Sequence, residues 1–127
     1  MRKVSKILVG TLAVSLIAGT TVLADTGKWD ETVKMTAYTT TSTSYRKGND
    51  LSYATLTCDQ IVDNSIILNF YSSNSDYTSS VGTVQYPSKS GRAGYSSYRS
   101  AASYRASVKL APTSRYSTAG LKGNFTP

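Results

Sequence analysis

Residues 104–110 read Tyr-Arg-Ala-Ser-Val-Lys-Leu and carry the clearest strand pattern of the chain. Apolar or small side chains occupy every second position, and polar or basic side chains occupy the positions between them. This period of two predicts a strand with one buried face, because successive side chains of a strand point to opposite sides. The outer face of this strand is therefore expected to be basic, with Arg105 and Lys109 on it.

Further candidate strands lie on both sides of this stretch, separated by segments rich in Ser, Gly, Asn and Asp that are typical of turns. They are residues 32–38, 51–58, 66–71, 81–86 and 121–125. Residues 66–71 are the most apolar of these and are expected to form a central strand. Residues 88–94 are expected to be a flexible connector, and residues 95–102 fit a strand, a loop or a short helix.

Six or seven short strands with no persuasive helix predict an all-β fold, a small antiparallel β-sandwich in one domain. A small barrel and a partly disordered chain are the alternatives. If the strands at 104–110 and 121–125 pair, Arg105, Lys109 and Lys122 share one exposed surface.

The first residues have the pattern of a secretory signal peptide, with Arg2, Lys3 and Lys6 before an apolar run. The expected cut follows Ala24, so residues 1–24 are expected to be a signal peptide and residues 25–127 a single secreted β domain. A membrane anchor is the alternative, although Asp25 stands where an anchor usually has Lys or Arg. The product is expected outside the cell, in association with the cell surface or released.

Charge is distributed unevenly along the expected mature chain. Residues 25–80 contain four basic and seven acidic residues, and residues 81–127 contain seven basic and no acidic residues. If both halves interleave in one sheet, they neutralise each other. If they separate, the second half presents a cationic face to partners rich in phosphate or carboxylate.

Cys58 is the only cysteine, so no disulfide can form within the chain. Alternation places it beside Ala54 and Leu56 on an inward face. We therefore expect a buried, inert thiol in a monomer, and we do not expect a dimer linked through Cys58.

Residues suited to catalysis are scarce. The chain has no histidine, which excludes nucleophile pairs and zinc sites that depend on imidazole. A carboxylate pair drawn from Glu31 and the six aspartates, as in a small hydrolase, is the remaining enzymatic alternative. Asp59, Asp63 and Asn64 lack the spacing of a dedicated calcium loop. We expect a protein that is not an enzyme, with no cofactor and no metal.

Arginine and tyrosine alternate through residues 92–116, a stretch without any acidic residue. Cations beside amphipathic rings suit an anionic partner, because the rings add contact area and the charges add attraction from a distance. The candidate ligand-binding residues are Arg92, Tyr95, Tyr98, Arg99, Arg105, Lys109, Arg115 and Tyr116. The alternative is a solvated face whose tyrosines are half-buried. Nucleic acid is not the expected partner, since the basic residues are spaced singly.

The segments Gly-Tyr-Ser-Ser-Tyr at residues 94–98 and Ser-Val-Lys-Leu at residues 107–110 resemble small Ser/Tyr-rich proteins exported by Gram-positive bacteria. The expected signal peptide, the size and the Tyr/Ser/Lys bias are also similar to lactococcin-type β-sandwich bacteriocins exported by the Sec route. That group typically contains histidine and is shorter, and its members often begin and end with aromatic-rich segments. This chain has Trp29 near the start of the expected mature protein but ends Asn-Phe-Thr-Pro.

The resemblance implies a secreted β-sandwich that acts at the bacterial envelope as a bacteriocin-like antagonist, bound to an anionic cell-wall or membrane component. A secreted accessory or structural protein without toxicity is the alternative. A small hydrolase is the third.

Overall fold

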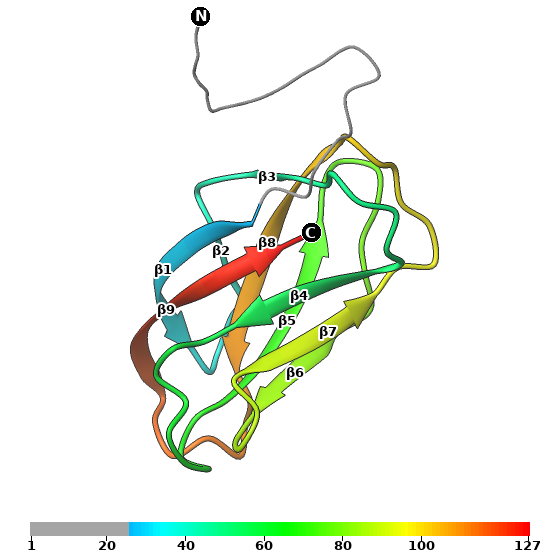
Figure 1. The fold of residues 1–127 in the computed structure, drawn as a ribbon. Helices are drawn as coiled ribbons and strands as arrows, with labels where there is room; N and C mark the ends of the chain where they lie inside the picture. The colour runs from blue at the N-terminus through cyan, green and yellow to red at the C-terminus, as the bar shows by residue number, and fades with distance from the viewer. Residues whose placement is uncertain (1–25) are drawn as a thin grey trace, which may run out of the picture.

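The computed structural model describes residues 26–127, which form nine strands in two antiparallel sheets (Figure 1). The expected signal peptide lies outside the described residues. Sheet A has the order β1 (Gly27–Lys34), β9 (Thr118–Thr126), β4 (Tyr53–Thr57) and β7 (Ser90–Gly94). Sheet B has the order β2 (Thr39–Thr40), β8 (Ser103–Leu110), β5 (Ile67–Ser73) and β6 (Gly82–Gln85), with β3 (Tyr45–Arg46) also paired to β8.

The expected small antiparallel sandwich is confirmed, and the two sheets do not close into a barrel. Seven of the nine strands have four residues or more, while β2 and β3 have two each. β5 lies inside sheet B between β8 and β6, as its apolar sequence predicted. Residues 26–127 contain no helix of the length and hydropathy needed to cross a membrane.

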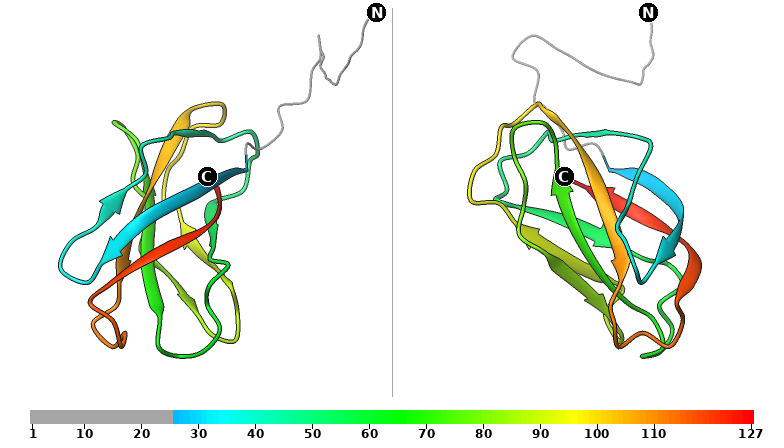
Figure 2. Two further views of the ribbon diagram at one scale, coloured as in Figure 1. Left: turned by 90° about the vertical axis from the view of Figure 1, so that its left-hand side faces the viewer. Right: turned by 180° about the vertical axis from the view of Figure 1, so that it is seen from behind.

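The core lies between the two layers, which the views of Figure 2 show from the side and from behind. Sheet A contributes Trp29, Val33, Leu56, Leu121 and Phe125, and sheet B contributes Leu68, Phe70, Tyr104, Val108 and Leu110. Each of these residues occupies an inward position of its strand, so the period of two places them together. Cys58 is fully buried in the same cluster, as expected.

The sequence left open whether β8 and β9 pair, and in the structure they do not. β9 pairs with β1 and β4 in sheet A, and β8 pairs with β2, β3 and β5 in sheet B. Residues 111–117 carry the chain from one sheet to the other, so Lys122 lies in a different layer from Arg105 and Lys109. The three cations do not share a surface.

Two strand boundaries also differ from the expectation. β1 begins earlier and ends at Lys34, because residues 35–37 bend as the chain leaves sheet A for sheet B, and Ala37 is exposed. The expected connector at 88–94 contains β7, which pairs with β4. The glycines that suggested a flexible connector have a different role. A Cβ at Gly91 would collide with the backbone oxygen of Thr83 on β6, so the close approach of β7 to β6 requires glycine there.

Residues 95–102, whose sequence fits a strand, a loop or a short helix, form an irregular loop between β7 and β8. The loop is held by backbone hydrogen bonds from Tyr95 to Ser52 and from Ala101 to Lys47. Ala101 has a φ of 66°, the left-handed region that residues with a Cβ rarely adopt.

Candidate binding face on sheet B

The eight candidate residues of the sequence stretch do not form one surface. Arg92 lies on β7 in sheet A, where its guanidinium stacks over the Tyr53 ring at 4.2 Å from the centroid. Arg99 lies in the β7–β8 loop, and Arg115 and Tyr116 lie in the β8–β9 loop. These two loops are at opposite ends of the sandwich (Figure 1).

Tyr95 and Tyr98 point into the molecule. Tyr95 is 8% exposed, and its hydroxyl shares a hydrogen bond of 2.6 Å with the buried hydroxyl of Ser72. Burial raises the pKa of Tyr95 to about 12. Tyr98 is half-buried against Tyr95 and donates its hydroxyl to the backbone oxygen of Asp50 at 2.6 Å. Their rings therefore stabilise the fold and leave little surface for a ligand.

The structure brings Arg105 and Lys109 together on the outer face of sheet B, which the right-hand view of Figure 2 looks onto. We call this surface the Arg105 face; it comprises the outward residues of β2, β5 and β8. Three rows of cross-strand neighbours make up this face. Arg105 lies opposite Ser73, Ser107 lies opposite Tyr71 and Thr40, and Lys109 lies opposite Asn69. The two cations thus lie at the ends of the face and Tyr71 lies in its middle.

An aromatic cluster adjoins Lys109. The rings of Tyr38 and Tyr71 meet edge to face with centroids 4.9 Å apart, and the Lys109 ammonium lies 5.4 Å from the Tyr38 ring centroid. Burial, with a smaller contribution from Tyr71, raises the pKa of Tyr38. Tyr38 is still 36% exposed, so it presents ring surface beside a cation to the solvent.

A polar hollow of about 400 Å³ adjoins Arg105. It is lined by Thr40, Ser44, Ser73, Asn74, Ser75, Ser103 and Arg105, and we call it the serine hollow. Asn74 is fixed there, because its side-chain oxygen accepts from the backbone N–H groups of Asp76 and Tyr77. Its amide nitrogen donates to the backbone oxygen of Ser103 at 3.3 Å. The lining consists of hydroxyls, one amide and one guanidinium.

The Arg105 face carries no carboxylate from its own sheet, because none of the five strands of sheet B contains Asp or Glu. The acids of the first half fall on β1 and in loops, although strands of both halves alternate in both sheets. The uneven charge of the sequence is therefore partly neutralised in sheet A and preserved on the outer face of sheet B. This arrangement favours an anionic ligand on the sheet B side.

Sequence reasoning identified the two cations but missed their polar and aromatic neighbours. The outward position of Tyr71 and Asn69 could have been predicted from the sequence, because both alternate with the apolar Leu68 and Phe70, which are buried. The position of Ser44 and Ser75 could not have been predicted, because they lie in loops distant in sequence that only the fold brings beside Arg105.

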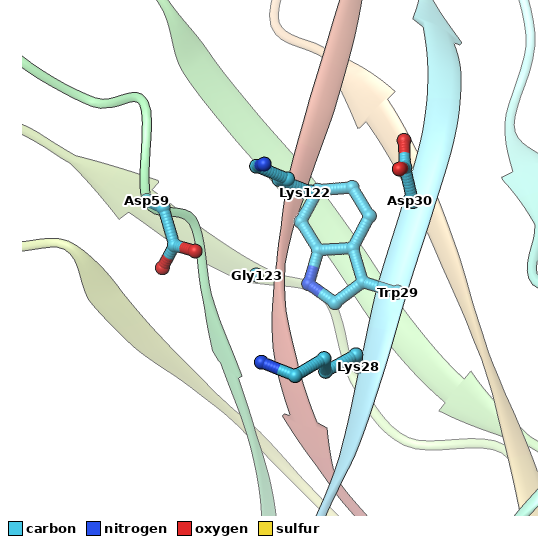
Figure 3. A pocket seen from close by; sticks show the side chains of 6 residues that line it. All are labelled: Lys28, Trp29, Asp30, Asp59, Lys122 and Gly123. Atoms are coloured by element: carbon cyan, nitrogen blue, oxygen red, sulfur yellow. The ribbon is translucent and has the colours of Figure 1, made fainter.

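A second hollow of about 300 Å³ lies on sheet A and is lined by Lys28, Trp29, Asp30, Asp59, Lys122 and Gly123 (Figure 3). The figure shows the indole of Trp29 extending from β1 across β9. The indole N–H already donates to the backbone oxygen of Thr57 at 2.9 Å. Two lysines and two aspartates balance each other here, so this hollow does not favour a polyanion.

Among residues 26–127, no group of three or more His, Cys, Asp or Glu side chains is placed to hold a metal ion. The arrangement on sheet B can bind oxyanions and hydroxyl groups through hydrogen bonds and charge. No protein-family model, no curated protein and no solved structure matches this chain.

Proposed function

We propose that the protein is exported and binds an anionic component of the bacterial cell envelope with the Arg105 face, as a non-enzymatic, bacteriocin-like antagonist. One observation carries the proposal: Arg105 and Lys109 flank one face of a sheet whose strands contain no acid. The signal-peptide pattern of residues 1–24 supports export. The resemblance to exported bacteriocins supports the role as an antagonist.

Binding of this kind needs a ligand with several charges. A single exposed ion pair contributes about 0 to 1 kcal/mol, so one cation on the surface binds weakly. Two cations that meet the same polymer act together, since the second contact forms at a high effective concentration. A planar guanidinium such as that of Arg105 is also able to donate two parallel hydrogen bonds to one phosphate or carboxylate.

The test is binding of the purified protein to isolated Gram-positive cell walls and intact cells across a salt series. The variant Arg105→Ser with Lys109→Ser should bind about tenfold more weakly at low salt and should lose most of its salt dependence. The matched control is Lys28→Ser with Lys122→Ser, which removes two exposed cations from sheet A and changes the net charge equally. Equal losses in both variants would mean that net charge alone binds the wall, and the assignment to sheet B would be wrong.

Growth inhibition, read in the same cultures, separates the antagonist from a secreted accessory protein. The antagonist requires inhibition that falls together with wall binding in the Arg105→Ser, Lys109→Ser variant. Wall binding without inhibition would favour the accessory role. An absence of binding by the unmodified protein at low salt would contradict both.

A further inference from the structure

We infer that the ligand of the Arg105 face is a chain in which oxyanions alternate with free hydroxyl groups, as in a polyol phosphate or an acidic glycan. In this arrangement the serine hollow holds one oxyanion and its neighbouring hydroxyls, and Lys109 holds a later oxyanion of the same chain. The inference rests on the proposed function and adds the chemical class of the ligand.

The serine hollow offers hydrogen-bonding groups that the protein leaves free. The side-chain hydroxyls of Ser44, Ser73, Ser75 and Ser103 make no hydrogen bond to another group among residues 26–127, and neither does the guanidinium of Arg105. Among the hydroxyls that line the hollow, that of Thr40 is already paired, in a 2.8 Å contact with Ser107. Hydroxyls donate and accept, so free ones in a hollow match ligand hydroxyls, while the guanidinium matches an oxyanion.

The middle of the face suits the carbon skeleton of such a chain. Tyr71 lies in the row of cross-strand neighbours between the two cations, and Tyr38 packs against its edge. Tyrosine rings provide rigid apolar contact at a small cost in side-chain entropy, and their hydroxyls tolerate water. A bare polyanion would make no use of this surface, whereas the C–H groups of a sugar or polyol pack on it.

The spacing of the two cations sets a length for the ligand. Arg105 and Lys109 are four residues apart on one strand, which corresponds to about 13 Å along β8. A single phosphorylated polyol reaches only one of them. A chain that spans both gains the second contact without a second loss of translational freedom, so affinity should rise in a step once the oligomer is long enough.

The experiment is isothermal titration calorimetry of the purified protein with four probes at constant ionic strength. The probes are glycerol 3-phosphate, glycerol phosphate oligomers of increasing length, uronate oligomers, and polyphosphate with the same number of charges. We expect hydroxylated oligomers to bind more tightly than polyphosphate, and the affinity to increase in a step with length. A preference for phosphate or for uronate identifies the oxyanion.

Two serine variants test the hollow directly. Ser44→Ala with Ser75→Ala removes two exposed hydroxyls and should weaken binding of the hydroxylated oligomers about fivefold, with polyphosphate unchanged. Ser96→Ala with Ser97→Ala, also exposed but in the β7–β8 loop, should change neither.

Equal binding of polyphosphate and hydroxylated oligomers, or no effect of the Ser44 and Ser75 substitutions, would overturn the inference. The proposed function would survive that result if Arg105→Ser with Lys109→Ser still weakened binding of every polyanion. If that variant bound all probes as the unmodified protein does, the proposed function itself would fail.

Discussion

Lys47 explains at the residue scale why two of the predicted binding tyrosines are inside. Its side chain is fully buried, and its ammonium donates to the side-chain oxygen of Asn49 at 2.9 Å and to the backbone oxygen of Pro127 at 3.1 Å. The rings of Tyr95 and Tyr98 each lie 4.9 Å from it. Burial lowers the pKa of Lys47, and nearby Asp50 partly opposes this. The rings of Tyr95 and Tyr98 therefore contact a buried cation of the protein itself, which comes from outside the predicted stretch, and not a ligand.

Tyr95 should make the protein sensitive to alkali. Because burial raises the pKa of Tyr95 to about 12, the folded state keeps its proton while the unfolded chain loses it above pH 10. The contribution of Tyr95 to the free energy of unfolding is therefore fully present below pH 10. As the pH rises from 10 through 12, the free energy of unfolding should fall by about 2 to 3 kcal/mol. Denaturant titrations at pH 8 to 12 measure this.

The variant Tyr95→Phe keeps the ring beside Lys47 and removes only the hydroxyl. It should cost about 1 to 2 kcal/mol at pH 8, because the buried Ser72 hydroxyl loses its partner. It should then lose less stability than the unmodified protein between pH 10 and 12. Tyr86→Phe, at a ring 45% exposed, should not change the stability at pH 8. An unchanged alkaline slope in Tyr95→Phe would contradict this assignment.

Cys58 should be unreactive in the native protein. It is fully buried, burial raises the pKa of its thiol, and its sulfur contacts the side-chain oxygen of Gln60 at 3.7 Å. The thiolate is the reactive form, so a thiol reagent should label Cys58 only as fast as the fold opens. Labelling kinetics with and without denaturant measure this. Rapid labelling without denaturant, or a dimer that reducing agent dissolves, would show an accessible thiol.

At the element scale, glycine allows strands of the two sheets to approach each other. β6 is the edge strand of sheet B and β7 the edge strand of sheet A, and they cross where Gly82 and Gly91 lie. A Cβ at Gly82 would collide with the backbone oxygen of Arg92, as a Cβ at Gly91 would with that of Thr83. In both cases the colliding atom belongs to the backbone, so it cannot move aside as the end of a flexible side chain could.

Gly91→Ala should therefore destabilise the protein by about 1 to 3 kcal/mol, the usual cost of extra volume in a closely packed site. Gly120→Ala is the matched control within a strand, because a Cβ there would meet no atom within 4 Å. It should be neutral or slightly stabilising. Thermal unfolding of both variants measures the difference, and equal melting temperatures would mean that β6 and β7 separate without cost.

At the scale of the whole molecule, the two halves of the sequence interleave in both sheets. β1, β4, β2 and β5 come from the first half, and β9, β7, β8 and β6 come from the second. The acidic first half (residues 25–80, net charge −3) and the basic second half (residues 81–127, net charge +7) therefore do not form two separate faces of the molecule. The charges differ between the two sheets instead. The strands of sheet A contain both basic residues and the acids Asp30 and Glu31, whereas every charged residue in the strands of sheet B is basic.

Alternation along single strands was sufficient to predict the all-β class, the inward position of Cys58 and the outward position of Arg105 and Lys109, because side-chain direction in a strand follows from the backbone alone. Which strands pair, and so which cations share a face, depends on contacts between distant residues that leave no local pattern. For that reason the sequence could not decide whether Lys122 shares a face with Arg105, and it did not reveal that Tyr95 is buried. The serine hollow and the buried Lys47 arise only when loops far apart in the chain meet, so they became visible only in the folded molecule.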